Sequence, residues 1–224
     1  GEQCPLPERG VILYTAELGL APEHLDAFTA WYSCRHAPDL YQAGFQACTS
    51  FQGSGNGMSV LNLYHLPSWD LFEEPAYRAV GPNDPYGAPI VALARAKANT
   101  PYDILPSWPG NRKAAIEGAW LSAIRFEAGA GTEQAIANHL ANVGAARLRE
   151  LGAIHVHLVR RGRPHPAAAS DQPSGAIFVE WGGRPPADDP VLPMLASAQV
   201  GLVSRTSVFV GQRVYPWPNG NEAN

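Results

Sequence analysis

The sequence predicts an α+β protein made of two tandem ferredoxin-like β-α-β-β-α-β units, whose antiparallel sheets pack into an α+β barrel. Apolar residues alternate with period two in the expected strands and recur every three or four residues in the expected helices, in the same order in both halves. Each unit covers only one face of its sheet with helices, so the second sheet is the natural cover for the other face. With 224 residues and 46% hydrophobic content, the chain can bury a sizeable core.

The first half contains the elements of one unit. In order these are a strand at 11–18, a helix from Pro22 to His36, strands at 45–53 and 59–66, a helical region from 68 towards 97, and a strand at 100–105. The GSGNG sequence between the two central strands is followed by a strand and not by Lys-Ser/Thr, which favours a hairpin turn over a phosphate loop. Pro38 predicts that the first helix breaks just after His36.

The second half repeats the order. It has a strand at 119–126, a helix from 132 to 151, a strand at 153–161, a strand at 176–181, a short helix at 190–199 and a strand at 204–215. The Pro- and Gly-bearing segment 108–118 is expected to join a unit of residues 1–107 to a unit of residues 119–224. The long loop at 161–175 is expected to be mobile, with a lid over the barrel mouth as the alternative.

Charge and composition exclude several classes of function. The formal net charge is -4 and the basic residues are scattered, so we expect no nucleic-acid partner. No apolar run reaches the roughly 18 residues of a membrane span, and the N-terminus lacks the order of a signal peptide, so we expect no membrane association and a cytoplasmic location. Cys4, Cys34 and Cys48 have no Cys-x-x-Cys spacing, which favours neither a disulfide framework nor a zinc site.

Four short motifs of the first half carry a family resemblance. They are WYSCRHAPDL at 31–40, Gly44-Phe45, NLYHL at 62–66 and EEPAYRAV at 73–80. Together they resemble the dimeric α+β barrel superfamily, especially its EthD-like members and related small-molecule enzymes. The resemblance covers residues 11–105 and is only architectural in the second half. It implies an active site inside the barrel, usually without a metal or organic cofactor. Its members include isomerases, cyclases, dehydratases, oxygenases and haem-binding branches, so it does not choose the reaction.

The first helix carries the leading candidate residues. His36 precedes Ala37-Pro38, and histidine is the side chain whose usual pKa suits proton transfer near neutral pH. It is a catalytic candidate, with a cap on the last helical carbonyls as the alternative. Tyr32, four residues earlier, is a second catalytic candidate, with a core role as its alternative. Trp31 and Asp39 are candidates for substrate binding, although Asp39 could instead cap the following turn.

The expected strands carry the remaining candidates. His65 replaces the glutamate that many members of the resembled family have, and it is a catalytic candidate if it faces inward. Tyr64, its neighbour, then faces the helices; either assignment is open. His155 and His157 share a face of one strand and, with Glu180 on the next strand, are expected to line the barrel and bind substrate. A metal site on these three residues is the weaker alternative.

These residues favour a cofactor-independent acid/base enzyme acting on a small aromatic or apolar oxygenated metabolite. The reaction would be that of a lyase or dehydratase, a cyclase or an isomerase. His36 would move a proton and Tyr32 or His65 would polarise a substrate oxygen, and each such group contributes on the order of 10² to 10⁴-fold. No cofactor and no metal are expected. The alternatives are a monooxygenase or haem-handling member of the same fold, and a non-catalytic small-molecule-binding module. A homodimer is compatible with all three.

Overall fold

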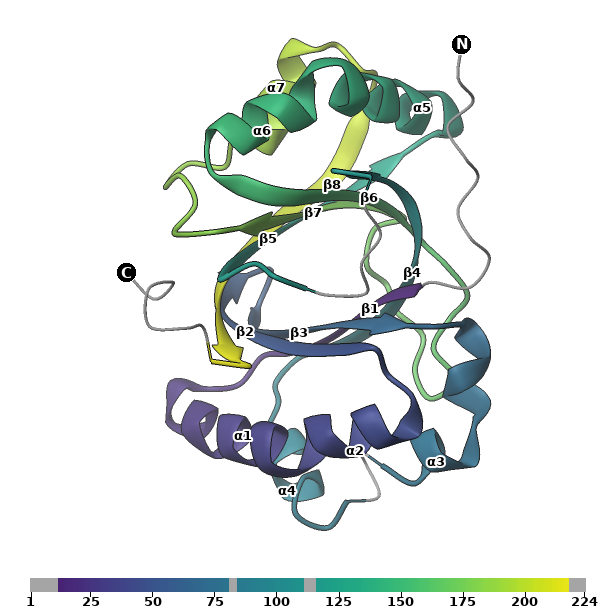
Figure 1. Ribbon diagram of the computed structural model, residues 1–224, viewed down its shortest axis with the longest axis vertical. Coiled ribbons are helices and arrows are strands. Elements are labelled where there is room, and N and C mark those ends of the chain that lie inside the picture. Colours follow the sequence, from purple (N-terminus) through teal and green to yellow (C-terminus); the bar gives the residue numbers. More distant parts are fainter. Residues whose placement is uncertain (1–11, 81–83, 111–115, 218–224) are drawn as a thin grey trace.

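The computed structural model describes residues 12–80, 84–110 and 116–217, which form a closed barrel of eight antiparallel strands (Figure 1). The strands are β1 (Ile12–Leu18), β2 (Ala47–Gly55), β3 (Met58–Leu66), β4 (Lys97–Trp108), β5 (Trp120–Ala128), β6 (Ala153–Arg161), β7 (Gly175–Trp181) and β8 (Val203–Tyr215). The helices are α1 (Leu25–Trp31), α2 (Ala37–Ala43), α3 (Pro75–Arg78), α4 (Ala88–Val91), α5 (Ala130–His139), α6 (Ala145–Glu150) and α7 (Val191–Ser197). They cover opposite sides of the barrel.

The strand order around the barrel is β1-β3-β2-β8-β5-β7-β6-β4. Each half of the chain contributes four adjacent strands, and the halves join where β2 pairs with β8 and where β4 pairs with β6. The predicted α+β barrel is therefore confirmed. The division into units at 1–107, 108–118 and 119–224 stays a prediction, since residues 111–115 of the joining segment lie outside the described part of the chain.

Side chains from all eight strands fill the barrel interior. Prominent members of this cluster are Leu13, Phe51, Leu61, Leu63, Tyr102, Leu121, Val159, Phe178 and Phe209. A buried ion pair between Arg125 Nη2 and Glu17 Oε1, 2.9 Å apart, lies among them. The implied active site inside the barrel is therefore corrected: the middle of the barrel is packed core, which leaves the outer faces of the sheet and the ends of the barrel for chemistry.

The first helix does not break at Pro38. It widens into a π-helical turn at Tyr32–His36, where the N–H of Ala37 donates to the Tyr32 carbonyl, and continues as α2 to Ala43. Gly44 then ends it with φ +113°. Pro38 lies in the first turn after the widened segment, where a missing N–H is tolerated. His36 is consequently neither a helix end nor a cap.

The second half contains the same widened turn at Leu140–Gly144, followed by α6 and by Gly152 with φ +107°. No proline lies between this turn and Gly152 in the sequence. The π-helical turn is therefore a property of both halves of the fold, and Pro38 is accommodated by it.

The region after β3 is less helical than expected. It contains a 3-10 helix at Trp69–Glu73 and the single turns of α3 and α4. Prolines explain this, because Pro75 and Pro89 each lie in the first turn of a short helix and Pro85 lies between them. The outer face of β1 and β3 thus receives a thinner cover than a full helix would give.

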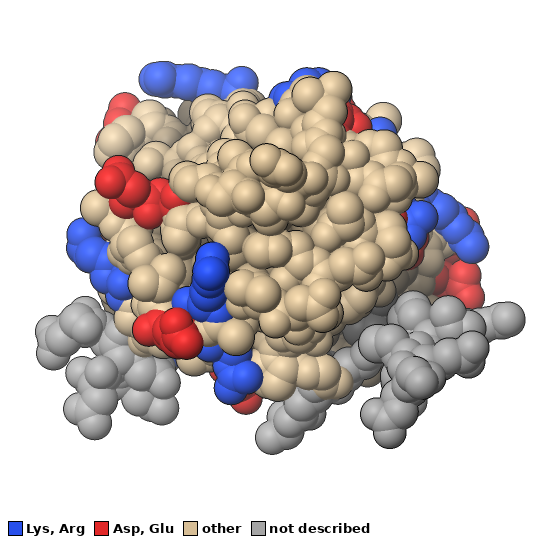
Figure 2. Space-filling view, turned by 90° about the horizontal axis from the view of Figure 1, so that it is seen from above, with Lys and Arg blue, Asp and Glu red and all other residues tan. Residues whose placement is uncertain are grey.

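Charged side chains of both signs are interspersed on the face of the molecule that Figure 2 shows. On the face of α5 to α7 shown in Figure 2, Lys and Arg lie beside Asp and Glu along the rim and on the lower left, and the centre and right of the face show other residues. In the described ranges, no helix is long and apolar enough to cross a membrane.

Candidate active site

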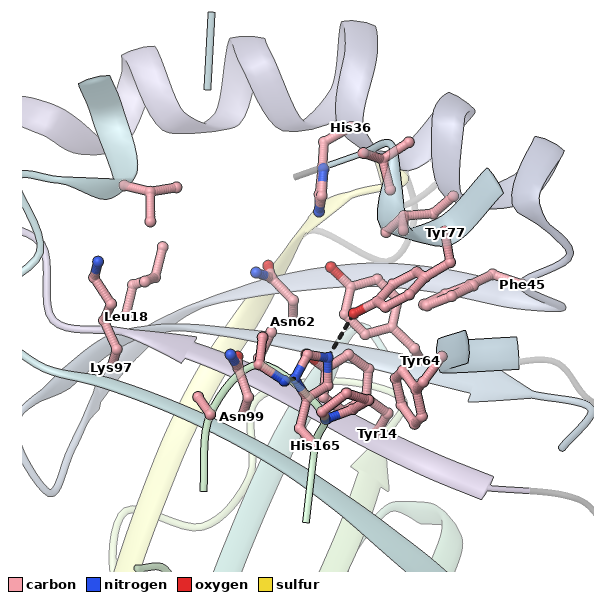
Figure 3. Close-up of a pocket in the computed structure, with 18 of the residues that line it drawn as sticks. Tyr14, Leu18, His36, Phe45, Asn62, Tyr64, Tyr77, Lys97, Asn99 and His165 are labelled. Carbon is pink, nitrogen blue, oxygen red and sulfur yellow. Dashed lines mark hydrogen bonds between the residues drawn. The ribbon is translucent and has the colours of Figure 1, made fainter. Parts of the chain in front are cut away.

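A cavity of about 580 Å³ lies between the outer face of β1 and β3 and the helices of the first half (Figure 3). Its volume falls in the usual range for small-molecule sites, about 300 to 1,000 Å³. Aromatic side chains form a large part of its wall, namely Tyr14, Phe28, Trp31, Phe45, Tyr64, Phe72 and Tyr77. Such a wall suits a flat, apolar ligand.

Strand alternation decides which side chains reach this cavity. On β1, Tyr14 and Ala16 face outward into it, whereas Leu13 points to the barrel core. On β3, Asn62 and Tyr64 face outward by the same alternation. The small side chain of Ala16 leaves the room that a larger residue would occupy.

His36 projects from the π-helical turn into the cavity towards Asn62 (Figure 3). Its ring stacks on the indole of Trp31, with centroids 4.5 Å apart and planes at 22°. Burial lowers the pKa of His36 from 6.5 to about 4, so its imidazole is neutral at pH 7. In the described part of the chain, no residue forms a hydrogen bond with this ring. His36 therefore offers a neutral ring nitrogen to a ligand.

An anchored carboxylate fixes the Trp31 side chain. The indole Nε1 donates to Asp84 Oδ2 at 2.8 Å. Arg35 donates to the same carboxylate, from Nε to Oδ2 at 3.2 Å and from Nη2 to Oδ1 at 3.1 Å. The hydrogen bond from Arg35 holds the pKa of Asp84 far below its usual range. Trp31 is thus held rigidly behind the His36 ring.

The cavity floor presents buried polar atoms of Asn62 and Tyr64. The buried Oδ1 of Asn62 and the buried hydroxyl of Tyr64 have no hydrogen-bond partner of ordinary geometry within the described residues. Burial raises the pKa of Tyr64 well above 10, so its hydroxyl keeps its proton. Each buried unsatisfied polar group costs about 1 to 3 kcal/mol. A ligand with an oxygen near these atoms would recover part of that cost.

The loop between β6 and β7 closes one side of the cavity with His165 to Ala168. The N–H of Ala167 donates to His165 Nδ1 at 3.1 Å, so Nε2 carries the ring proton and donates to the Tyr77 hydroxyl at 2.6 Å. The His165 ring also stacks on Tyr14 with centroids 5.4 Å apart. The loop was expected to be mobile or to cover the barrel mouth; instead these contacts fasten it over the outer cavity.

His165 was not recognised from the sequence. The composition of its loop, rich in proline and alanine, indicates irregular backbone but not its direction. Because β6 pairs with β4, and β4 with β1, the loop lies next to the first half's cavity. Only this long-range pairing reveals its role.

The structure divides the predicted site residues into two groups. Trp31, His36 and Tyr64 line the outer cavity. Tyr32 lies behind it, because its buried hydroxyl donates to the Thr49 carbonyl at 3.0 Å. Asp39 is half-buried in the first turn of α2 and is not part of the lining.

The second group lies at one end of the barrel. Its members are His65, His155, His157 and Glu180. His65 projects from β3 on the face opposite Tyr64, so it cannot assist His36 across the sheet. Both of its ring nitrogens are buried without a hydrogen-bond partner among the described side chains and backbone. In those same ranges, no group of three His, Cys, Asp or Glu residues could hold a metal ion.

The matching space in the second half is closed. Gly144 ends its π-helical turn as His36 ends the first, and a Cβ at Gly144 would lie 3.2 Å from the Met194 methyl carbon. Ile136, Leu140, Val191 and Leu195 pack there against the sheet. The cavity and its polar residues thus belong to the first half.

Comparisons with known proteins identify the fold. No family model and no curated protein matches the sequence. An anthrone oxidase-like protein matches with a TM-score of 0.61 and 11% identity, over 93% of each chain. A candidate monooxygenase from Lactobacillus acidophilus matches with 0.58 and 11%, over 92% of this chain and 94% of the other. A candidate chlorite dismutase matches with 0.55 and 12%, over 92% and 96%.

The chain has the dimeric α+β barrel fold. The EthD-like resemblance and the tandem duplication are not confirmed by these matches and stay predictions. The expected cofactor-independent lyase, cyclase or isomerase is corrected, because the matching structures are named for oxidase, monooxygenase and chlorite dismutase proteins. They favour the alternative of a monooxygenase or haem-handling protein.

Proposed function

We propose that the protein is an enzyme that uses dioxygen to oxidise a small aromatic molecule in the outer cavity. The observation that carries this proposal is the neutral imidazole of His36, which forms no hydrogen bond with the described residues and points into a cavity lined by aromatic side chains. The names of the structural neighbours support oxygen chemistry for this fold. A cytoplasmic location and a homodimer are part of the same proposal.

The reaction that fits best converts an activated methylene group, flanked by aromatic rings, to a carbonyl. The substrate first loses a proton from carbon to the His36 ring, and the carbanion is delocalised onto a ring oxygen. The carbanion then reacts with dioxygen; one oxygen atom stays as the new carbonyl and the other leaves as water with the two hydrogens of the methylene. The balance is CH₂ plus O₂ to C=O plus H₂O, so no external reductant is consumed.

The other cavity residues have distinct roles in this reaction. The Asn62 side chain and the Tyr64 hydroxyl lie where they can stabilise the substrate oxygen as it becomes negative. Trp31, held by Asp84, keeps the His36 ring in place. Because the pKa of His36 is low, the imidazole is a weak base, and the substrate must itself be a stabilised carbon acid. The aromatic wall suits such a substrate.

Haem binding is the second candidate, and the same histidine favours it. A neutral imidazole with an open nitrogen is a common axial ligand of haem iron. The residues that would hold the group are His36, through its ring nitrogen, and Lys97 at the cavity edge, whose ammonium could pair with a carboxylate of the haem. When bound, haem would supply the activation of dioxygen or of an oxygen-containing anion. A Soret band on titration with haemin, lost in His36→Ala, would favour this candidate.

An oxygen electrode tests the proposed function with anthrone as the probe. The wild-type protein should consume oxygen when anthrone is added, and His36→Ala should lose the activity by about 10²-fold or more. His24→Ala is the matched control, because His24 lies on the same helical segment outside the cavity. Equal oxygen uptake by wild type and His36→Ala would refute the role of His36. Anthrone binding without any oxygen uptake would instead indicate a binding module.

A further inference from the structure

A second arrangement of reactive side chains lies at the end of the barrel, away from the outer cavity. Ser107 on β4 and His157 on β6 are paired across the two strands, and Ser107 Oγ lies 2.9 Å from His157 Nδ1. On the other side of the ring, His157 Nε2 lies 2.7 Å from Glu180 Oε2. A hydroxyl, an imidazole and a carboxylate are thus joined in sequence.

The carboxylate fixes the direction of the hydrogen bonds. Glu180 is buried, which by itself raises its pKa, but the hydrogen bond from His157 and the backbone N–H of Gly118 lower it overall. An ionised carboxylate only accepts, so Nε2 of His157 carries a proton. In the neutral ring Nδ1 then has the free lone pair, and it accepts the Ser107 hydroxyl proton.

The backbone holds this carboxylate in place. Glu180 Oε1 accepts hydrogen bonds from the N–H groups of Glu117 at 2.6 Å and Gly118 at 2.9 Å. The histidine and the acid lie on paired strands of the closed barrel, in the continuous pairing that begins at His155 after an irregularity next to Ala153. The arrangement is therefore rigid, as a positioned general base requires.

Ser107 is accessible while the acid behind it is not. Ser107 is half-buried, the His157 side chain is 11% exposed and that of Glu180 is 1% exposed. Exposure thus rises from the orienting acid through the base to the hydroxyl. That order is expected when the hydroxyl must meet an incoming molecule.

The His65 ring lies near the chain of hydrogen bonds from Ser107 through His157 to Glu180, which we call the relay. His65 lies close enough to His157 and Glu180 for their charges to affect its pKa, and both of its ring nitrogens are unsatisfied within the described chain. A neutral imidazole carries one N–H. The end of the barrel therefore contains a buried N–H donor and a buried nitrogen acceptor, both of His65, that form no hydrogen bond with the described residues.

We propose that Ser107 is a nucleophile for acyl transfer, with His157 as its general base and Glu180 as the positioning residue of that base. The substrate class is an ester or another activated acyl compound. Ser107 Oγ bonds to the carbonyl carbon while its proton passes to His157 Nδ1; the leaving alcohol then takes that proton as its bond to the acyl carbon breaks. Water then bonds to the acyl carbon while its proton passes to His157 Nδ1. The Ser107 oxygen takes that proton as its bond to the acyl carbon breaks, which releases the carboxylic acid. The step requires no redox partner.

A fluorophosphonate probe tests this site independently of oxygen chemistry. Its phosphorus bonds to the serine oxygen and fluoride leaves with the proton. Intact-protein and peptide mass spectrometry should show one adduct, on Ser107, in the folded wild-type protein. Ser107→Ala should lose the adduct, and His157→Gln should slow its formation by about 10²-fold or more.

Ser170→Ala is the matched control. Ser170 is also half-buried and its hydroxyl is hydrogen-bonded, 2.6 Å from Thr100 Oγ1, but it has no imidazole partner. This variant should label like the wild type. The proposal is overturned if the wild type forms no adduct, if the adduct is on another residue, or if His157→Gln labels at the wild-type rate while circular dichroism shows it folded. Those outcomes would assign the relay to holding β4, β6 and β7 together.

Discussion

The Trp31 indole and the His36 imidazole stack at a centroid distance of 4.5 Å, and the Trp31 N–H is held by Asp84 at 2.8 Å. Trp31 thus links the carboxylate of Asp84 to the His36 ring, which faces the cavity. Gly87 passes so close to the indole that a Cβ there would lie 2.2 Å from it. The indole is therefore fixed in place, and its stacking contact also restricts the position of the His36 ring.

Trp31→Phe should destabilise the protein by about 1.5 to 3 kcal/mol, because it removes a hydrogen bond to a buried charged group. The midpoint of urea denaturation measures this, with an unchanged slope as the sign of an intact fold. Trp217→Phe is the control, because Trp217 is 77% exposed. If both variants unfold at the wild-type midpoint, the Trp31–Asp84 contact does not stabilise the fold.

The rate of oxygen consumption should be nearly constant from pH 8 down to about pH 5 and fall towards pH 4. The cause is burial, which lowers the pKa of His36 to about 4 and keeps the ring in its basic form over this range. A histidine with its ordinary pKa would already lose activity near pH 6.5. A half-maximal rate at pH 6.5 would contradict the burial of His36.

The free energy of unfolding should decrease as the pH falls from 6.5 to 5. Burial lowers the pKa of His36, His65 and His165 to about 4 from 6.5, so in this window the unfolded chain binds protons that the folded chain does not. The stabilisation is complete above pH 6.5 and is lost as the pH approaches 4. Chemical denaturation at several pH values should show that the free energy of unfolding changes less with pH in His36→Asn than in the wild type. An unchanged dependence on pH would mean that His36 titrates alike in both states.

Tyr77→Phe should raise KM for the aromatic substrate and make the loop between β6 and β7 easier to cleave by protease. It removes the 2.6 Å hydrogen bond that ties His165 to α3. Limited proteolysis with mass mapping measures the opening of the loop. Tyr86→Phe serves as the control, because Tyr86 is 66% exposed. Equal cleavage in all three proteins would show that other contacts hold the loop.

The strands and the barrel were predictable because alternation with period two survives in each half. Features that depend on backbone detail or on long-range contacts could not be predicted from the sequence. Pro38 indicated a helix break, yet a π-helical turn accommodates it. Prolines at 75, 85 and 89 were visible, and they explain the thin cover that leaves a cavity. Strand alternation put Tyr64 and His65 on opposite faces, but the sequence could not say which faced inward.

His36 was identified as a candidate from its sequence context, and the structure places it in the cavity. The two residues proposed to act with it, Tyr32 and His65, do not line the cavity. Tyr32 is occupied by the Thr49 carbonyl, and His65 lies across the sheet. Asn62 and His165 line the cavity without having been singled out. Isolated polar residues on a strand or in a loop carry no periodic signal, so only the folded chain reveals their direction.

The most direct test of the central claim is the oxidation of anthrone under ¹⁸O₂, followed by mass spectrometry of the product. The proposed reaction predicts one ¹⁸O atom per product molecule, the second oxygen in water, and loss of product formation in His36→Ala but not in His24→Ala. Product without ¹⁸O, or the same yield from His36→Ala as from the wild type, would contradict it.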